Sequence, residues 1–185
     1  MQNKKQIYNT PNILTISRIL IIPVIFFLLF FKEEFYGIYA SIFFVIAVLT
    51  DFVDGYIARK KNIVTNFGIF LDPIADKLLV ITILIMLIPL KRIPAWIVVI
   101  IVFREIFIMG LRAIASEEGV VLSAGREGKW KTAFQMFGIF FLLVHYDNFY
   151  LNFENTGLVL IFISIIFSII SLYKYLKSVS GIFIG

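Results

Sequence analysis

The chain has 185 residues, of which 61% are hydrophobic and 21 are phenylalanine, and its formal net charge at pH 7 is +5. Apolar stretches of roughly 15 to 20 residues recur along its whole length, which excludes a soluble globular domain. Several stretches match the roughly 20 residues that a helix needs to cross a hydrocarbon core, and they lack the strict alternation of a membrane barrel. Cysteine is absent, which excludes disulfides, thiolate metal sites and a cysteine nucleophile.

The composition predicts an all-α integral membrane protein with six transmembrane helices in one bundle, forming a single domain over residues 1–185. The loops between the helices are short, and no Ser-rich, Pro-rich or repetitive segment indicates a linker. A basic segment precedes the first helix, but no small-residue cleavage site follows it, so a retained helix is expected rather than a signal peptide. In chain order, the expected spans are 13–31, 36–59, 66–90, 94–115, 130–146 and 157–176.

Basic residues near the ends of these spans fall mostly on one side of the predicted bundle, and that side is expected to face the cytoplasm. Both chain termini and the loop of residues 60–66 belong to the same side. The positive charge indicates topology and attraction to anionic lipid, because no nucleic-acid recognition module accompanies it. The expected cytoplasmic residues are Lys4, Lys5, Arg59, Lys60, Lys61, Arg112, Arg126, Lys129, Lys131, Lys174 and Lys177, and the outer ones are Lys32, Lys91 and Arg92.

Four aspartates lie on the second and third expected helices, in the sequence DFVDGYIARKKNIVTNFGIFLDPIAD of residues 51–76. At about 100° per residue, Asp51 and Asp54 share one face of their helix, and the spacing of four stacks Asp72 and Asp76 on one face of the next. The connection between the two helices is short and basic, which makes them antiparallel neighbours at the cytoplasmic surface. We therefore expect the four carboxylates at similar depth, just inside the cytoplasmic boundary of the membrane.

Carboxylates inside a membrane need neutralisation, since each costs at least about 2.5 to 3.5 kcal/mol and clustered ones repel each other. Protonation, as in a proton carrier, is one solution. Four carboxylates without histidine or thiolate are also a ligand set for hard divalent cations such as Mg²⁺ or Mn²⁺, and they suffice for two ions. A two-ion site implies in-line displacement at phosphorus, in which a carboxylate takes a proton from the attacking hydroxyl.

Small residues accompany the aspartates on the same helix faces. Gly55, Ala58 and Gly68 leave the backbone exposed there, so that a ligand or the partner helix can come close. Arg59 adds a cation one turn after Gly55, where it can meet a phosphate. Close helix packing alone also explains each small residue, but not their combination with four spaced carboxylates.

These residues form the pattern D-x-x-D-G-x-x-A-R, then eight residues, then G-x-x-x-D-x-x-x-D, which resembles the signature of the CDP-alcohol phosphatidyltransferase family. The match has no gap. The resemblance extends to PNILTISRIL at the start of the chain, LDPIADKLLV after the signature, FREIFIMGLRA in the fourth helix and GKWKTAFQM opening the fifth. These segments resemble the bacterial branch of the family that uses glycerol 3-phosphate. No functional position is carried over onto the last 40 residues.

The resemblance implies an enzyme of phospholipid biosynthesis that transfers a phosphatidyl group from CDP-diacylglycerol to glycerol 3-phosphate and releases CMP. It implies that two divalent ions are bound by the four aspartates, with Asp76 also acting as the base on the acceptor hydroxyl. It further implies a homodimer in the bacterial inner (plasma) membrane, with the active site facing the cytoplasm. The residues implied to contact the CDP-diacylglycerol donor are Asn12, Thr15, Gly55, Arg59 and Thr65.

A second group of charges marks the fourth and fifth expected helices. Glycerol 3-phosphate brings its own phosphate and needs cations away from the carboxylates, and the candidates are Arg112, Lys129, Lys131 and Arg104. The two lysines open the fifth helix, where free amides and the helix dipole also favour an anion. The alternatives are that Arg104 is neutralised by the adjacent Glu105 inside the bundle, and that the lysines and Arg112 are topology charges.

Other functions remain open from the residues alone. Because the signature handles only the shared donor, the acceptor within the family can instead be inositol phosphate, serine or another phospholipid. A divalent-cation or proton transporter also explains carboxylates inside a membrane, but the aspartates cluster on two adjacent helices near one surface, which favours an enzyme. A non-catalytic lipid-binding or assembly protein leaves the carboxylate spacing unexplained.

Overall fold

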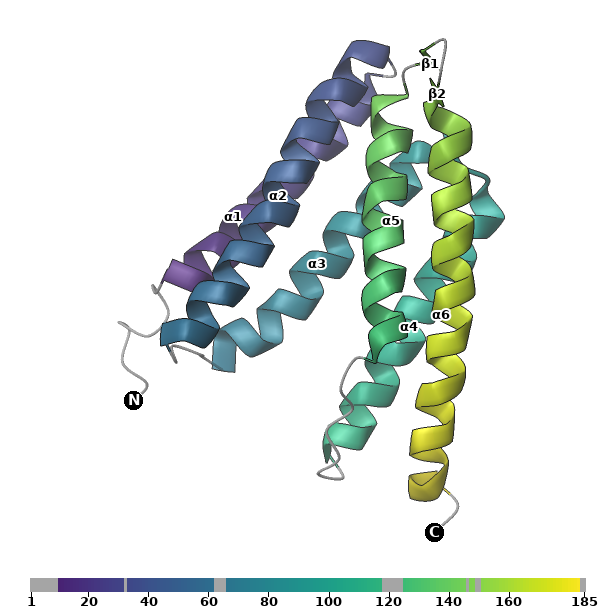
Figure 1. Cartoon of the computed structure of the whole chain (residues 1–185). Helices are drawn as coiled ribbons and strands as arrows, with labels where there is room; N and C mark the ends of the chain where they lie inside the picture. The colour runs from purple at the N-terminus through teal and green to yellow at the C-terminus, as the bar shows by residue number, and fades with distance from the viewer. Residues whose placement is uncertain are drawn as a thin grey trace. The chain divides into compact units, whose positions relative to one another are not determined.

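A computed structural model describes residues 10–31, 33–61, 66–117, 125–145, 147–148 and 151–183, and side chains within 14–31, 33, 35–51, 71–117, 125–145 and 152–178. Over these ranges the chain folds into helices and one very short β-hairpin (Figure 1). The helices are α1 Thr10–Phe30, α2 Glu34–Lys61, α3 Asn66–Leu87, α4 Ala95–Glu117, α5 Arg126–Val144 and α6 Phe153–Phe183, and the strands are β1 Asp147–Asn148 and β2 Leu151–Asn152.

The predicted all-α class is confirmed, and each of the six expected spans coincides with one helix. The largest differences in bounds are at α5, which begins at Arg126, and at α6, which continues to Phe183. Among the described residues, only the α6 segment Phe153–Ser178 is long and apolar enough by itself to cross a membrane, and Leu14–Phe30 and Phe35–Asp51 are shorter apolar helical segments. Six membrane crossings therefore stay a prediction.

Polar residues determine where α6 begins. The side-chain oxygen of Asn152 accepts a hydrogen bond from the backbone N–H of Asn155 at 2.7 Å, so Asn152 is the N-cap of α6. The hydroxyl of Thr156 donates to the backbone carbonyl of the same asparagine at 2.8 Å. Asn152 also pairs with Asp147 in the antiparallel β1–β2 hairpin, which therefore joins the end of α5 to the start of α6. This hairpin was not predicted.

The chain divides into two compact units. The first contains α1, α2 and α3, and within it α1 contacts both of the other helices. Its interior is apolar, because one stripe of each helix is directed inward. The buried side chains of this interior are Ile25 and Leu29 of α1, Ala40, Phe44 and Ala47 of α2, and Ala75, Leu79, Ile83 and Leu84 of α3.

The second unit contains α4, α5 as far as Leu142, the hairpin and α6. Its buried apolar residues include Ile97, Ile101, Ile108, Ile139 and Ile161. Two basic residues that were expected near the helix ends as topology charges are buried in it as well. Arg92 is 4% exposed and donates to the backbone carbonyl of Leu142 at 3.2 Å, and Lys131 is 6% exposed. Both side chains reach hydrogen-bond acceptors that the fold holds in place.

Within the second unit, α5 and α6 approach each other through glycine. A Cβ atom added at Gly138 would lie 2.9 Å from Ile161 Cγ1 and 3.0 Å from the carbonyl oxygen of Gly157. A Cβ atom at Gly157 would lie 2.8 Å from Leu142 Cγ. A side chain at either position would therefore separate the two helices, as at other helix contacts made by small residues.

Gly157→Ala is accordingly expected to destabilise the protein by roughly 1 to 3 kcal/mol, the usual cost of adding a methyl group to a packed interior. Thermal unfolding in detergent measures the effect as a lower Tm. Gly110→Ala is the matched control, because nothing lies within 4 Å of its added Cβ and the residue is exposed on α4. A Tm for Gly157→Ala at or above that of Gly110→Ala would show that α5 and α6 do not pack in this way.

Candidate functional site

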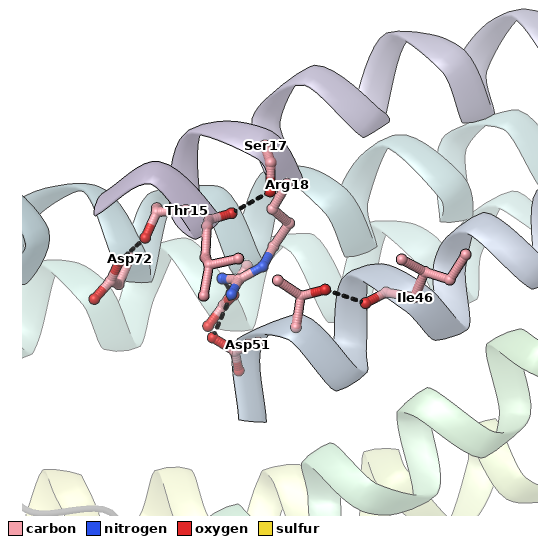
Figure 2. A network of polar contacts seen from close by, with 9 residues as sticks. Thr15, Ser17, Arg18, Ile46, Asp51 and Asp72 are labelled. Carbon is pink, nitrogen blue, oxygen red and sulfur yellow. Dashed lines mark hydrogen bonds and ion pairs between the residues drawn. The ribbon is translucent and has the colours of Figure 1, made fainter. Parts of the chain in front are cut away.

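A buried arginine joins two of the predicted metal ligands in the first unit. Arg18 of α1 lies one helical turn beyond Thr15, and its side chain is 1% exposed. Its Nη2 lies 2.8 Å from Asp51 Oδ1 on α2 (Figure 2). Its Nη1 lies 2.5 Å from Asp76 Oδ1 on α3. The Asp51 and Asp76 side chains are 45% and 41% exposed. Each carboxylate therefore contacts a buried cation and is also accessible to solvent.

Thr15 makes the neighbouring contact on the same face of α1. Its hydroxyl is buried and donates to Asp72 Oδ1 at 2.5 Å, as Figure 2 shows. Thr15 and Arg18 are three residues apart on α1, and Asp72 and Asp76 are four apart on α3. The two contacts therefore lie one helical turn apart between α1 and α3, which run in the same direction. The structure thus brings the predicted donor ligand Thr15 together with the predicted metal ligand Asp72.

The other predicted members of this site lie beyond the described side chains. Asp54, Gly55 and Arg59 belong to the last part of α2, where only the backbone is described, as is Asn12 in the first turn of α1. Thr65 is in the segment 62–65, outside the described residues. Their predicted roles in binding metal or CDP-diacylglycerol therefore stay predictions.

The carboxylates that are described suit a divalent ion by their chemistry. Asp51 and Asp76 come from different helices and meet at a single cation, and carboxylate oxygens are the ligands that Mg²⁺ and Mn²⁺ prefer. Over the described ranges, however, no three acidic or histidine side chains are close enough to hold a metal together. Asp54 is outside those ranges, so the two-ion site stays a prediction.

Sequence reasoning missed Arg18. The sequence feature that could have identified it is a lone arginine inside the apolar stretch of residues 13–31, because a charge within a predicted membrane span usually has a functional partner. Periodicity did not identify the partner, since Asp76 is 58 positions away in the chain. Only the packing of α1 against α2 and α3 brings the three charges together.

Three buried charges gather separately in the second unit. Glu105 Oε1 on α4 lies 2.9 Å from Arg104 Nη1 and 2.5 Å from Lys131 Nζ on α5. All three side chains are nearly inaccessible to solvent, and they carry a net charge of +1. The alternative that Arg104 pairs with Glu105 is therefore realised, and Lys131 joins the pair. A single carboxylate holds two of the predicted acceptor cations and leaves one positive charge in excess.

Arg112, the third predicted acceptor cation, belongs to a different contact in this unit. Its Nη2 donates to the hydroxyl of Tyr175 on α6 at 2.5 Å, and its guanidinium carbon lies 5.2 Å from the centre of the tyrosine ring. Among the described residues, the buried Nε atoms of Arg112 and Arg104 have no hydrogen-bond partner. An anion that accepted from these atoms would remove the cost of burying them unpaired.

Lys129 is exposed at the start of α5, apart from the buried group around Glu105. Two residues nearer the N-terminus, Glu127 forms an ion pair with Lys174 of α6. The hydrogen bond from Lys174 lowers the pKa of the Glu127 carboxyl below its ordinary value. The structure therefore divides the predicted acceptor cations: Arg104 and Lys131 share Glu105, Arg112 contacts Tyr175, and Lys129 faces solvent.

Comparison with known proteins places these sites in one family. Residues 8–170 match the family model described as CDP-alcohol phosphatidyltransferase, and the chain belongs to that family. The resemblance read from the aspartate signature is thereby confirmed. The matched range extends over both compact units and includes the described residues of the carboxylate site and of the basic group around Glu105.

Proteins named CDP-diacylglycerol–glycerol-3-phosphate 3-phosphatidyltransferase are similar to the chain over most of its length. The Bacillus subtilis protein is 39% identical over 182 residues, which cover 91% of this chain and 93% of the relative. The Rickettsia typhi protein is 38% identical over 171 residues, with 92% and 96% covered. The Haemophilus influenzae protein is 35% identical over 179 residues, with 94% and 95% covered.

Proposed function

We propose that the chain transfers the phosphatidyl group of CDP-diacylglycerol to glycerol 3-phosphate, giving phosphatidylglycerol phosphate and CMP. The observation that carries this assignment is the similarity, over more than nine-tenths of both chains, to relatives whose names state this donor and this acceptor. The arrangement of the first unit agrees with the chemistry, since carboxylates on two helices meet beside a buried threonine and a buried arginine.

The four aspartates support a displacement at phosphorus in which the acceptor hydroxyl is the nucleophile. Asp51, Asp54, Asp72 and Asp76 hold two divalent ions, Mg²⁺ or Mn²⁺, which when bound neutralise the phosphate oxygens of the donor. Asp76 takes the proton from the acceptor hydroxyl of glycerol 3-phosphate. That oxygen forms a bond to the phosphorus that carries diacylglycerol, while the bond from this phosphorus to the oxygen of CMP breaks.

The donor is held by residues on both sides of this group. Asn12 and Thr15 on α1, Gly55 and Arg59 on α2, and Thr65 contact the cytidine diphosphate head, while the acyl chains stay in the bilayer. Support for Thr15 comes from its buried hydroxyl, which is fixed against Asp72 at 2.5 Å. The same contact fixes the carboxylate, so the threonine links the donor site to the metal ligands.

The acceptor phosphate is bound by Arg112, Arg104, Lys131 and Lys129. Support comes from the buried Nε atoms of the two arginines, which lack partners among the described residues and can each donate to a phosphate oxygen. Glu105 holds Arg104 and Lys131 in place and cancels only one of their two charges. The group therefore keeps a positive charge for an anionic acceptor, whereas free serine would gain little from it.

The protein is a multi-pass enzyme of the bacterial inner membrane with six spans in one domain, and it forms a homodimer with cytoplasmic termini and active site. Support for the spans comes from large apolar side chains exposed on the helices, such as Phe27 (61%), Val99 (65%) and Phe103 (67%). Apolar surface of this kind suits contact with lipid. Six spans also agree with the short connections between the helices.

Cysteines introduced into this cysteine-free chain test the orientation. Lys61→Cys, at the end of α2, is expected to stay unlabelled when intact cells are treated with a membrane-impermeant thiol reagent. Asn155→Cys is expected to be labelled, and it is preferable to Asn152→Cys because the Asn152 side chain caps α6. Labelling of position 61 from outside would reverse the proposed orientation.

A direct acceptor comparison tests the proposed reaction. Purified full-length protein receives labelled CDP-diacylglycerol with glycerol 3-phosphate, serine or inositol phosphate in parallel. Glycerol 3-phosphate alone is expected to give a labelled lipid product with equimolar release of CMP. Efficient transfer to serine or inositol phosphate, with none to glycerol 3-phosphate, would show that the acceptor is wrong although the donor chemistry is right.

A further inference from the structure

Arg18 is a buried charge that stands within the site proposed for the divalent ions. Its side chain is 1% exposed, and it forms ion pairs with Asp51 and Asp76, which come from two different helices. Burying an arginine costs free energy unless carboxylates neutralise its charge. Two neighbouring carboxylates repel each other unless a cation lies between them. The three charges therefore depend on one another.

The same two aspartates are also proposed ligands of the divalent ions. If the proposed function is correct, Asp51 and Asp76 also bind divalent ions, and this inference rests on that assignment. Positive charges that share carboxylates repel one another, so Arg18 and a bound metal weaken each other's contacts. The guanidinium is fixed by its covalent attachment to α1, whereas the ions exchange with solvent.

We propose that Arg18 is a positioning residue of the carboxylate site, which holds Asp51 and Asp76 together across α2 and α3 and competes with divalent ions for both. It keeps the carboxylates from repelling each other before the ions bind. It also weakens ion binding, because every ion that enters meets a cation already present. The enzyme thereby remains folded at low metal concentration and binds its ions reversibly.

A purely structural role for Arg18 makes a different prediction. If the arginine only joins three helices, its removal loosens the ligands and weakens metal binding. If it competes for the carboxylates, its removal strengthens metal binding while the metal-free protein loses stability. The direction of the change in metal affinity therefore separates the two roles.

The experiment uses full-length protein in detergent, freed of metal, with Arg18→Gln, Arg18→Lys and the control Arg92→Gln. Arg92 is similarly buried but donates to a backbone carbonyl, and it follows the far end of α3. Mn²⁺ affinity is measured by the paramagnetic resonance signal of the free ion, and Tm is measured in chelator. A double-mutant cycle of Arg18→Gln with Asp76→Asn in chelator tests the ion pair independently of any metal.

We expect Arg18→Gln to bind Mn²⁺ roughly tenfold or more tightly than wild type, since a cation within about 6 Å changes a carboxylate's proton affinity by a factor of 10 to 1,000. Its Tm in chelator should fall, and Mn²⁺ should raise that Tm by more than in wild type. Arg18→Lys should restore most of the wild-type affinity, Arg92→Gln should leave Mn²⁺ affinity unchanged, and the cycle should be non-additive.

Several results would overturn the role of Arg18. Unchanged or weaker Mn²⁺ binding in Arg18→Gln, while wild type binds Mn²⁺, contradicts competition and leaves the proposed reaction intact. Additive effects in the double-mutant cycle show that Arg18 and Asp76 do not interact. Failure of wild type to bind Mn²⁺, even with CDP-diacylglycerol present, instead overturns the two-ion mechanism, and competition with ions along with it.

Discussion

Asp76→Asn is expected to lower turnover by roughly 10²- to 10⁴-fold, because the amide keeps the size of the carboxylate and cannot accept the acceptor's proton. Some binding of CDP-diacylglycerol should survive, because other residues are proposed to contact the cytidine diphosphate head. The substitution also removes the 2.5 Å ion pair with the buried Arg18, so a lower Tm is expected at the same time. Rates are measured at saturating donor, acceptor and Mn²⁺.

Asp51→Asn is the matched control for this loss. It removes the other carboxylate partner of Arg18, at 2.8 Å, and a proposed metal ligand, but it leaves the base in place. High Mn²⁺ concentration should therefore restore much of the Asp51→Asn activity and little of the Asp76→Asn activity. Equal recovery of the two variants would mean that Asp76 is a metal ligand only, and full activity of Asp76→Asn would contradict the mechanism.

Arg112→Ala is expected to lower kcat/KM for glycerol 3-phosphate by roughly 30- to several thousand-fold. Loss of one partner from a desolvated charge pair costs roughly 2 to 5 kcal/mol, and each 1.4 kcal/mol is about tenfold. The KM for CDP-diacylglycerol should change little, because the residue serves the acceptor. Steady-state kinetics with each substrate varied in turn distinguishes these effects.

Tyr175→Phe separates phosphate binding from local packing at Arg112. It removes the hydroxyl that accepts the Arg112 hydrogen bond and retains the ring beneath the guanidinium. A small change in kcat/KM is expected, far below that of Arg112→Ala. Lys129→Ala should have an intermediate effect at most, because this lysine is exposed. Unchanged kinetics in both Arg112→Ala and Lys129→Ala would mean that these residues are topology charges.

Local sequence signals predicted the helices well. The six apolar stretches predicted the positions of all six helices, with bounds that differ by a few residues. The β1–β2 hairpin was missed because each strand contains only two residues, too few for an alternating pattern. No linker composition separates the two compact units, and the single domain stays a prediction.

The sequence predicts a carboxylate site because four aspartates repeat at helical spacing within a short segment. Asp51, Asp72 and Asp76 could be placed on helix faces before their partners were known. Arg18 and Lys131 could not be placed in the same way, because their contacts lie 58 and 26 positions away in the chain. Periodicity identifies the face of a helix, whereas tertiary packing decides which charge that face meets.

The central claim is tested most directly by measuring phosphatidyl transfer first without metal and then after metal is restored. Purified full-length protein is treated with excess chelator and mixed with labelled CDP-diacylglycerol and glycerol 3-phosphate, and excess Mg²⁺ is then added to the same reaction. If the aspartates of α2 and α3 hold the ions that carry the reaction, labelled phosphatidylglycerol phosphate and CMP appear only after the addition. Full product formation in chelator would contradict the account.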